Sequence, residues 1–222
     1  METAKKATAK KKLIDDNAII SKYMDYVLEK GEEPNNVFSF CKEHKIEEFD
    51  FYTFFGSIDA LKQEIWVKFF ENSIGTIQKE AAFEGYSDKN KLLTLYFTLF
   101  ELLTLNRSYV LFTLKENKEG LKNLKSLKLF RNHFKEFIVS IVNDSIESND
   151  KVAKITKPVF SEGAWIQFLF LLKFWIEDTY KGFEKTDVLI EKSVNTVVDL
   201  LDTKPLESLF DLGKFLWKEK MN

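Results

Sequence analysis

Cysteine, histidine and glycine are scarce in this 222-residue chain, and their scarcity excludes several kinds of site. The single cysteine, Cys41, cannot form an internal disulfide, which is typical of proteins from a reducing compartment. The two histidines, His44 and His133, lie far apart in the sequence and outside any metal-binding or catalytic motif. No two of the eight glycines are close enough to form a phosphate-binding loop. We therefore expect a cytoplasmic protein with no catalytic residues, no metal site and no cofactor.

Proline is also rare, and its placement favours helices. The three prolines, at positions 34, 158 and 205, each precede an apolar segment with helical periodicity, where a missing N–H costs a helix nothing. The lysine-rich start of the chain has no apolar stretch of the kind found in signal peptides. The most apolar segment, residues 163–172, has ten residues without a charge. Because about 20 such residues are needed to cross a bilayer, we expect no transmembrane helix.

The formal net charge of −2 hides two basic segments. Residues 1–12 carry five lysines against one glutamate, a formal sum of +4. Residues 115–135 carry seven basic side chains against two acidic ones, a formal sum of +5. Both segments could contact anions, or they could simply keep a tail and a helix face in water. The charge pattern leaves these two interpretations open.

Apolar residues recur at helical spacing along almost the whole chain, which predicts an all-α protein of about nine to ten helices. Gly31 stands where the C-cap of the first helix belongs, and Asn35 and Asn36 stand where the N-cap of the second belongs. Ser57 begins a long helix with two apolar stripes, which indicates two packing partners. The predicted helices cover residues 13–30, 36–44, 46–54, 57–77, 92–105, 109–115, 121–146, 164–176, 187–202 and 205–220.

A motif around residue 55 carries a resemblance to a known family. Tyr52, Phe55, Ser57 and Leu61 have the spacing found at the end of the helix-turn-helix in TetR-type proteins. In that family the recognition helix ends in Tyr-x-x-Phe, a serine caps the next helix, and a leucine four residues later fixes that helix to the core. The resemblance covers about residues 13–75 by motif, and the remainder is similar in helix order and apolar character.

The resemblance to TetR regulators implies a fold with three parts. These are a basic disordered arm at residues 1–12, a three-helix helix-turn-helix head at residues 13–57, and a helical domain for ligand binding and dimerisation at residues 58–222. The family's function implies a homodimeric transcriptional regulator. It would bind duplex DNA through the head and a small apolar effector through the larger domain, here called the body.

The face expected to meet DNA is acidic. Glu47 replaces the serine that starts the recognition helix, Lys45 replaces the glycine of the turn, and residues 35–61 have a formal sum of −3. The negative charge of this face disfavours binding to the duplex, because non-specific affinity for DNA comes from protein cations that release counterions. A carboxylate can still accept a hydrogen bond from cytosine, and the N-terminal lysines could supply the cations. The resemblance therefore implies DNA contacts from Lys10, Lys11, Lys12, Asn36, Lys45, Glu48 and Tyr52.

Two further sets of residues are expected in the body. The helix at 164–176 is apolar nearly all round, so we predict that it is buried nearly all round, with a second subunit covering part of it. With the helix at 187–202 it resembles the pair that forms the four-helix dimer interface of TetR proteins. The implied interface residues are Phe170, Phe174, Ile190, Val194, Val197 and Leu201. An effector pocket between the body helices would be lined by Tyr96, Phe100, Phe112, Phe130, Phe134, Trp165 and Phe168.

Two other functions fit the same layout. The acidic head, the 22 phenylalanines and the amphipathic segment 205–220 are similar in layout to a TetR-fold lipid-binding accessory protein of ubiquinone biosynthesis. That similarity implies a lipid ligand, a head that has lost DNA binding, and a segment 205–220 that meets a membrane surface. Packing of this segment on the body or on a partner subunit is the simpler explanation of its wide apolar face. A purely structural dimer is the third function, and it would have a fully packed body without a cavity.

Overall fold

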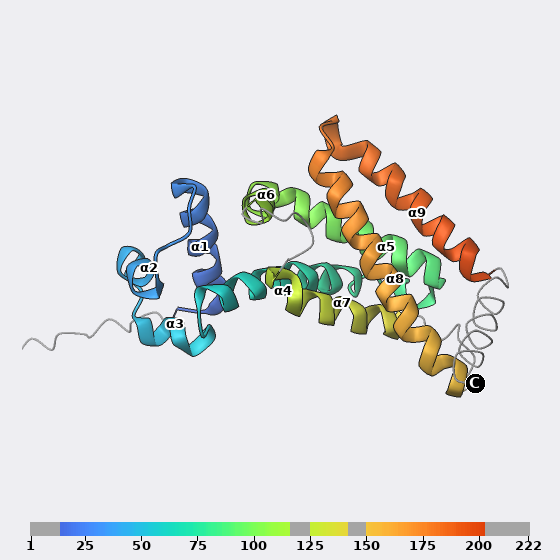
Figure 1. Cartoon of the computed structure of the whole chain (residues 1–222), viewed down its shortest axis with the longest axis horizontal. Helices are drawn as coiled ribbons and strands as arrows, with labels where there is room; N and C mark the ends of the chain where they lie inside the picture. Colours follow the sequence, from blue (N-terminus) through green and yellow to red (C-terminus); the bar gives the residue numbers. More distant parts are fainter. Residues whose placement is uncertain (1–13, 116–124, 142–149, 203–222) are drawn as a thin grey trace, which may run out of the picture. The chain divides into compact units, whose positions relative to one another are not determined.

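The computed structural model describes residues 14–115, 125–141 and 150–202 (Figure 1). All regular secondary structure in these residues is helical, which confirms the all-α prediction. The chain divides into two compact units, residues 1–65 and 66–222. The segments 1–12 and 205–220, for which we predicted an arm and an amphipathic helix, lie outside the described residues.

The first unit contains three short helices and the start of a longer one. Two of the predicted caps are present: Gly31 ends the first helix in the left-handed conformation, and the Asn36 side chain accepts a hydrogen bond from the Ser39 N–H at 2.8 Å. The apolar faces of these helices meet in a core that includes Tyr23, Phe40 and Phe51, all fully buried. The elements are α1 (Asp16–Lys30), α2 (Val37–His44), α3 (Glu48–Phe54) and the first residues of α4 (Ile58–Ile77).

The turn between α2 and α3 contains a residue in an unfavourable backbone conformation. Lys45 has φ 56° and ψ 41°, in the left-handed region where the family has glycine. A side chain with a Cβ costs about 1–2 kcal/mol in this region. The turn closes through the N–H of Ile46, which donates to the carbonyl of Cys41 at 2.9 Å. The turn therefore forms with lysine in place of glycine, and the unfavourable backbone conformation of Lys45 lowers the stability of the fold.

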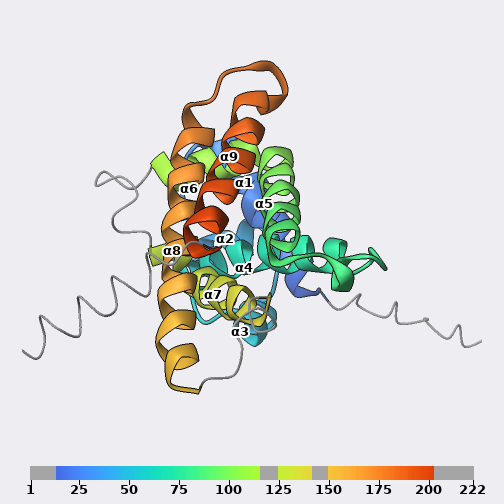
Figure 2. The same cartoon turned by 90° about the vertical axis from the view of Figure 1, so that its right-hand side faces the viewer.

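The second unit is a bundle in which α8 lies against α7, and α9 lies against α5 and α8. Figures 1 and 2 show α8 and α9 as a hairpin, joined by the short turn η4. The elements are the rest of α4, η1 (Phe83–Gly85), α5 (Asp88–Leu105), α6 (Arg107–Lys115), η3 (Lys125–Leu127), α7 (Lys128–Ile141), α8 (Asp150–Glu177), η4 (Lys181–Phe183) and α9 (Glu184–Asp202).

Pro158 lies inside a helix, so the prediction that it precedes one is wrong. The helix α8 begins at Asp150, well before the predicted start at residue 164. Proline fixes φ at a value that a helix accepts, and its main cost is one backbone hydrogen bond. The apolar segment that follows is long enough to hold the helix together across the proline.

Replacing Lys45 with glycine should stabilise the protein. The substitution removes the left-handed cost but increases the entropy of the unfolded chain, so we expect a gain of about 0.5–1 kcal/mol in the free energy of unfolding. The control is Gly31→Ala, because Gly31 has φ 73° and a Cβ added there would meet nothing within 4 Å. Ala at 31 should lose about 1 kcal/mol. Urea unfolding followed by circular dichroism measures both, and destabilisation by Lys45→Gly would contradict the assigned turn.

Candidate functional site

The described residues that we predicted to contact DNA lie on α2, on α3 and in the turn between them. Lys45 and Glu48 are exposed, and the side chain of Tyr52 is 52% exposed. Asn36 is also exposed, but its carboxamide oxygen is engaged in the N-cap of α2. Lys10, Lys11 and Lys12 lie outside the described residues. The turn and α3 together therefore present one lysine, one glutamate and one tyrosine from the predicted set.

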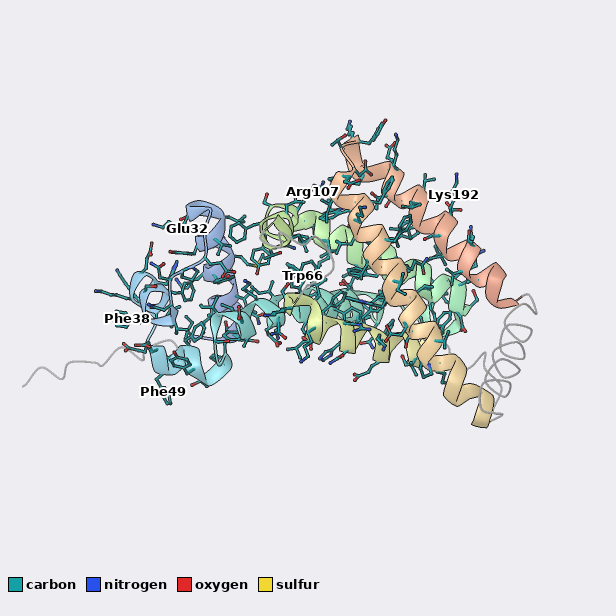
Figure 3. All side chains as sticks on the ribbon, viewed as in Figure 1. Glu32, Phe38, Phe49, Trp66, Arg107 and Lys192 are labelled. Carbon is teal, nitrogen blue, oxygen red and sulfur yellow. The ribbon has the colours of Figure 1, made fainter. Side chains whose placement is uncertain are left out.

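Two phenylalanines on this unit are unexpectedly exposed. Phe49 on α3 is 81% exposed and Phe38 on α2 is 57% exposed, and Figure 3 shows both projecting from their helices. The sequence predicted neither exposure. Glu47 and Glu48 are exposed beside Phe49 in the chain. The exposed surface of α3 thus combines carboxylates with aromatic rings, and α3 itself contains no lysine or arginine.

The groups behind α3 add no positive charge at neutral pH. Burial, together with the nearby charge of Glu48, raises the pKa of the Cys41 thiol to about 11, so the thiol stays protonated and unreactive. Burial and the nearby Lys22 lower the pKa of His44 below its usual value, so its imidazole is neutral. His44 therefore does not compensate the negative charge on the exposed surface of α3.

Four of the seven residues that we predicted to line a ligand pocket pack against one another as aromatic pairs. The ring centroids of Phe130 and Phe168 are 5.0 Å apart, those of Trp165 and Phe168 are 5.3 Å apart, and those of Phe134 and Phe168 are 5.6 Å apart. These are the separations of packed aromatic pairs, and all four side chains are buried. A ligand among these rings would have to displace at least one of them. We call Phe130, Phe134, Trp165 and Phe168 the aromatic cluster.

The other three predicted lining residues have different surroundings. Tyr96 is buried, and its hydroxyl donates to the Ala164 carbonyl at 2.9 Å, so it joins α5 to α8. Burial raises the pKa of this phenol, which is therefore neutral. Phe112 is half-buried on α6. Phe100 packs against Phe168 and also lines a cavity that the sequence did not indicate.

This cavity lies between α5, the end of α8 and the start of α9, and its volume is about 270 Å³. We call it the elbow cavity, because the turn η4 forms part of its wall. Aromatic rings from three elements and two carboxylates face it. Its lining includes Phe97, Phe100, Glu101, Trp175, Phe183 and Asp187.

Arg107 holds the end of α8 beside the elbow cavity. Its guanidinium donates to the carbonyls of Trp175 at 3.0 Å and Ile176 at 3.1 Å, which belong to the last turn of α8. It also stacks between two aromatic rings, 4.3 Å from the centroid of Trp175 and 4.5 Å from that of Phe183. A cation at a helix C-terminus is favourable, and stacking on two rings adds to this. Arg107 therefore fixes two walls of the cavity without being part of its lining.

Comparison with known proteins identifies the body. Residues 91–216 match the family model described as tetracyclin repressor-like, C-terminal domain. The match covers more than half of the chain. The chain belongs to the TetR family. Comparison with curated proteins gave no match.

TetR membership confirms the resemblance drawn from the head motif, although the matched residues lie in the body. It also supports the TetR-like fold and points to a regulator rather than an enzyme. One segment of α8, Lys157–Glu177, is long and apolar enough to cross a membrane by length and composition alone. Its residues Phe168, Leu171 and Trp175 are fully buried within the bundle, as in the core helix of a folded body.

The two helices expected at a TetR dimer interface differ in what they expose. Ile190 and Val194 on α9 are fully buried in their own chain, so they have no surface left for a partner. On α8, Phe170 is 54% exposed and Phe174 is half-buried. Val197 is half-buried, and the side chain of Leu201 lies outside the description.

Two apolar residues of α8 that we did not assign to the interface are also exposed. Ile166 is 65% exposed and Val159 is 53% exposed, so this chain alone leaves part of α8 uncovered. Their spacing from Phe170 places all three on one side of the helix. We call Val159, Ile166 and Phe170 the α8 stripe.

Replacing Arg107 with lysine should destabilise this TetR-family body. Lysine keeps the charge but loses the planar fork that reaches the α8 carbonyls and fits between the two rings. We expect a loss of about 2 kcal/mol in the free energy of unfolding, measured by urea titration. The control is Arg131→Lys, because Arg131 forms an exposed ion pair with Glu162 at 2.7 Å, and such pairs contribute about 1 kcal/mol or less. Equal losses in the two variants would contradict the role given to Arg107.

Proposed function

We propose that this TetR-family protein is a cytoplasmic, homodimeric transcriptional regulator that binds duplex DNA through residues 13–57. The observation that carries the proposal is the geometry of α2 and α3. Phe40 and Phe51 lock the two helices together with ring centroids 6.2 Å apart, and α3 keeps an exposed surface. Recognition helices of this kind insert an exposed face into the major groove.

The chemistry of α3 favours particular bases. A carboxylate such as Glu48 can accept a hydrogen bond from the amino group of cytosine, and an exposed aromatic ring such as Phe49 can contact the methyl group of thymine. Arginine and lysine, which read guanine, and asparagine and glutamine, which read adenine, are all missing from α3. We therefore expect the recognised strand to present pyrimidines to this helix.

The cations for DNA binding would come from outside α3. Lys45 is exposed in the turn, and the N-terminal segment contributes Lys10, Lys11 and Lys12. Basic N-terminal arms supply such contacts to the minor groove in other helix-turn-helix proteins. In this proposal the arm provides most of the affinity, and α3 provides the discrimination between sequences.

The direct test is a selection from genomic DNA. The purified protein is incubated with sheared DNA from its source, and the bound fragments are sequenced at low and at physiological salt. We expect an inverted repeat whose half-sites are separated by about one turn of the duplex, roughly 34–36 Å. The absence of enrichment at both salt concentrations would refute DNA binding. It would favour the second candidate from the sequence, a lipid-binding accessory protein that keeps the fold.

Changing Lys10, Lys11 and Lys12 together to alanine should reduce the salt dependence of DNA binding. Each lost phosphate contact lowers the slope of log affinity against log salt by about 0.9, so we expect a change of about 3. The control is Lys128, Lys181 and Lys192 changed together to alanine, because these are exposed lysines of the body. Fluorescence anisotropy over a salt series measures the slope. An unchanged slope in the arm variant would remove the arm from the proposal.

The α8 stripe is the surface that supports dimerisation. Large apolar side chains in a row on one helix are expensive to leave in water, and α8 exposes them where TetR proteins form their interface. Gly163 lies between Val159 and Ile166, and a Cβ placed there would meet nothing within 4 Å, so this part of the helix is open to close approach. We propose that two copies of α8 and α9 pack along this stripe.

Phe170→Glu should convert the protein to a monomer. The substitution places two charges at the interface of a twofold dimer and removes two apolar contacts. Light scattering over a range of concentrations measures the mass. Phe49→Glu is the matched control, because Phe49 is exposed in the other unit and the substitution is the same. If the wild-type protein is a monomer, or if the Phe170 variant stays a dimer, the proposed interface is wrong.

A further inference from the structure

We propose that the elbow cavity binds a small organic cation with apolar substituents, such as an aryl or alkyl ammonium ion. This would be the effector class of the protein, and that regulatory part rests on the proposed function. The binding itself does not depend on DNA. The site differs from the pocket expected in the sequence, because it lies beside the aromatic cluster, with Phe100 as the shared residue.

The first argument is the nature of the walls. Phe97, Phe100, Trp175 and Phe183 supply aromatic rings from α5, α8 and η4. Aromatic faces attract cations through their quadrupole, and a cation within about 6 Å of a ring gains about 0.5–2 kcal/mol. Two of these rings, those of Trp175 and Phe183, already contact a cation within the protein, because the guanidinium of Arg107 lies between them. The walls are therefore suited to an organic cation.

The second argument is the charge at the cavity. Glu101 and Asp187 both line it, and neither has a hydrogen-bond or ion-pair partner among the described residues. Burial raises the pKa of Asp187, and the charges of Asp178 and Glu184 raise it further. A bound cation would relieve this repulsion, whereas an anion would add to it.

The neighbouring charged groups do not neutralise the two carboxylates. Arg107 donates to the carbonyls at the end of α8 and lies outside the lining. Lys185 lies over the ring of Tyr180, 3.4 Å from its centroid. Asp178 is satisfied within the protein, because it accepts hydrogen bonds from the N–H and the hydroxyl of Thr186, at 3.0 Å and 2.8 Å. The positive charges of Arg107 and Lys185 are outnumbered by the carboxylates Glu101, Asp178, Glu184 and Asp187, so the formal charge around the cavity stays negative.

The third argument is the backbone of the wall. Phe183 has φ 58°, a left-handed conformation that is a genuine outlier for a bulky residue. Such conformations cost about 1–3 kcal/mol and persist where the surrounding structure imposes them. Here the conformation places an aromatic ring both against Arg107 and at the cavity.

Because the volume of about 270 Å³ is at the low end for ligand sites, the ligand must be small.

The test compares three probes of similar shape on the full-length protein without DNA. Benzyltrimethylammonium carries the positive charge, neopentylbenzene is its uncharged isostere, and phenylacetate carries a negative charge. Calorimetry and the fluorescence of the tryptophans measure binding. We expect the cation to bind at least about tenfold more tightly than the neutral isostere, and the anion to bind more weakly still. No binding of the cation, or equal binding of the isostere, would overturn the proposal.

Variants locate the site. Asp187→Asn should weaken binding of benzyltrimethylammonium at least about tenfold, and Glu101→Gln provides the same test if the first variant fails to fold. Glu191→Gln is the control, because Glu191 is an exposed carboxylate on α9 that does not line the cavity. Unchanged affinity in a folded cavity variant would overturn the assignment. Binding of the cation by a protein that enriches no DNA would leave this inference standing and refute the proposed function alone.

Discussion

The packing of the aromatic cluster is the constraint on which the rest of the body depends. Phe130 and Phe134 on α7 meet Trp165 and Phe168 on α8 at ring separations of 5.0–5.9 Å, and each such pair contributes about 0.5–1.5 kcal/mol beyond the burial of its surface. These contacts fix the rotation of α8 about its own axis. Once that rotation is fixed, the opposite side of the helix must point outward, and it carries the α8 stripe. The same rotation brings the end of α8 to Arg107. The interface that we propose and the wall of the elbow cavity are thus both consequences of one packed layer.

In the head, the backbone conformation and the surface charge are set by different residues. In the turn between α2 and α3, Lys45 adopts a left-handed conformation that favours glycine, at a cost in backbone energy. The charge of the head does not follow the family, since α3 presents carboxylates and aromatic rings and its neighbours Cys41 and His44 stay neutral. Shape depends on a few buried contacts, whereas charge depends on exposed residues that can change without disturbing the core. A helix-turn-helix can therefore persist while its affinity for DNA moves to other residues.

The sequence predicted what local rules determine. Gly31 and Asn36 were recognisable as caps because each satisfies backbone groups within its own helix. Pro158 misled the prediction, because its cost to α8 is offset by packing that a local pattern does not contain. The elbow cavity was not predictable for a similar reason. Its walls come from residues far apart in the chain, and the left-handed φ of Phe183 has no signal in the sequence. Aromatic periodicity indicated the core but could not show whether the rings pack together or surround a space.

Dimerisation should matter more for this protein than for a regulator with a basic head. In the proposed function, a single acidic head gains little from the phosphate backbone, so its own contribution to DNA affinity would be low at physiological salt. Joining two heads makes the second contact intramolecular, and the combined affinity then depends steeply on how the subunits are held. In our proposals the helices that hold them, α8 and α9, are also the helices joined at the elbow cavity. A cation there could change DNA affinity only by as much as it prefers one arrangement of that hairpin over another. A modest preference is sufficient, because a DNA complex held by weak individual contacts has little binding free energy to lose.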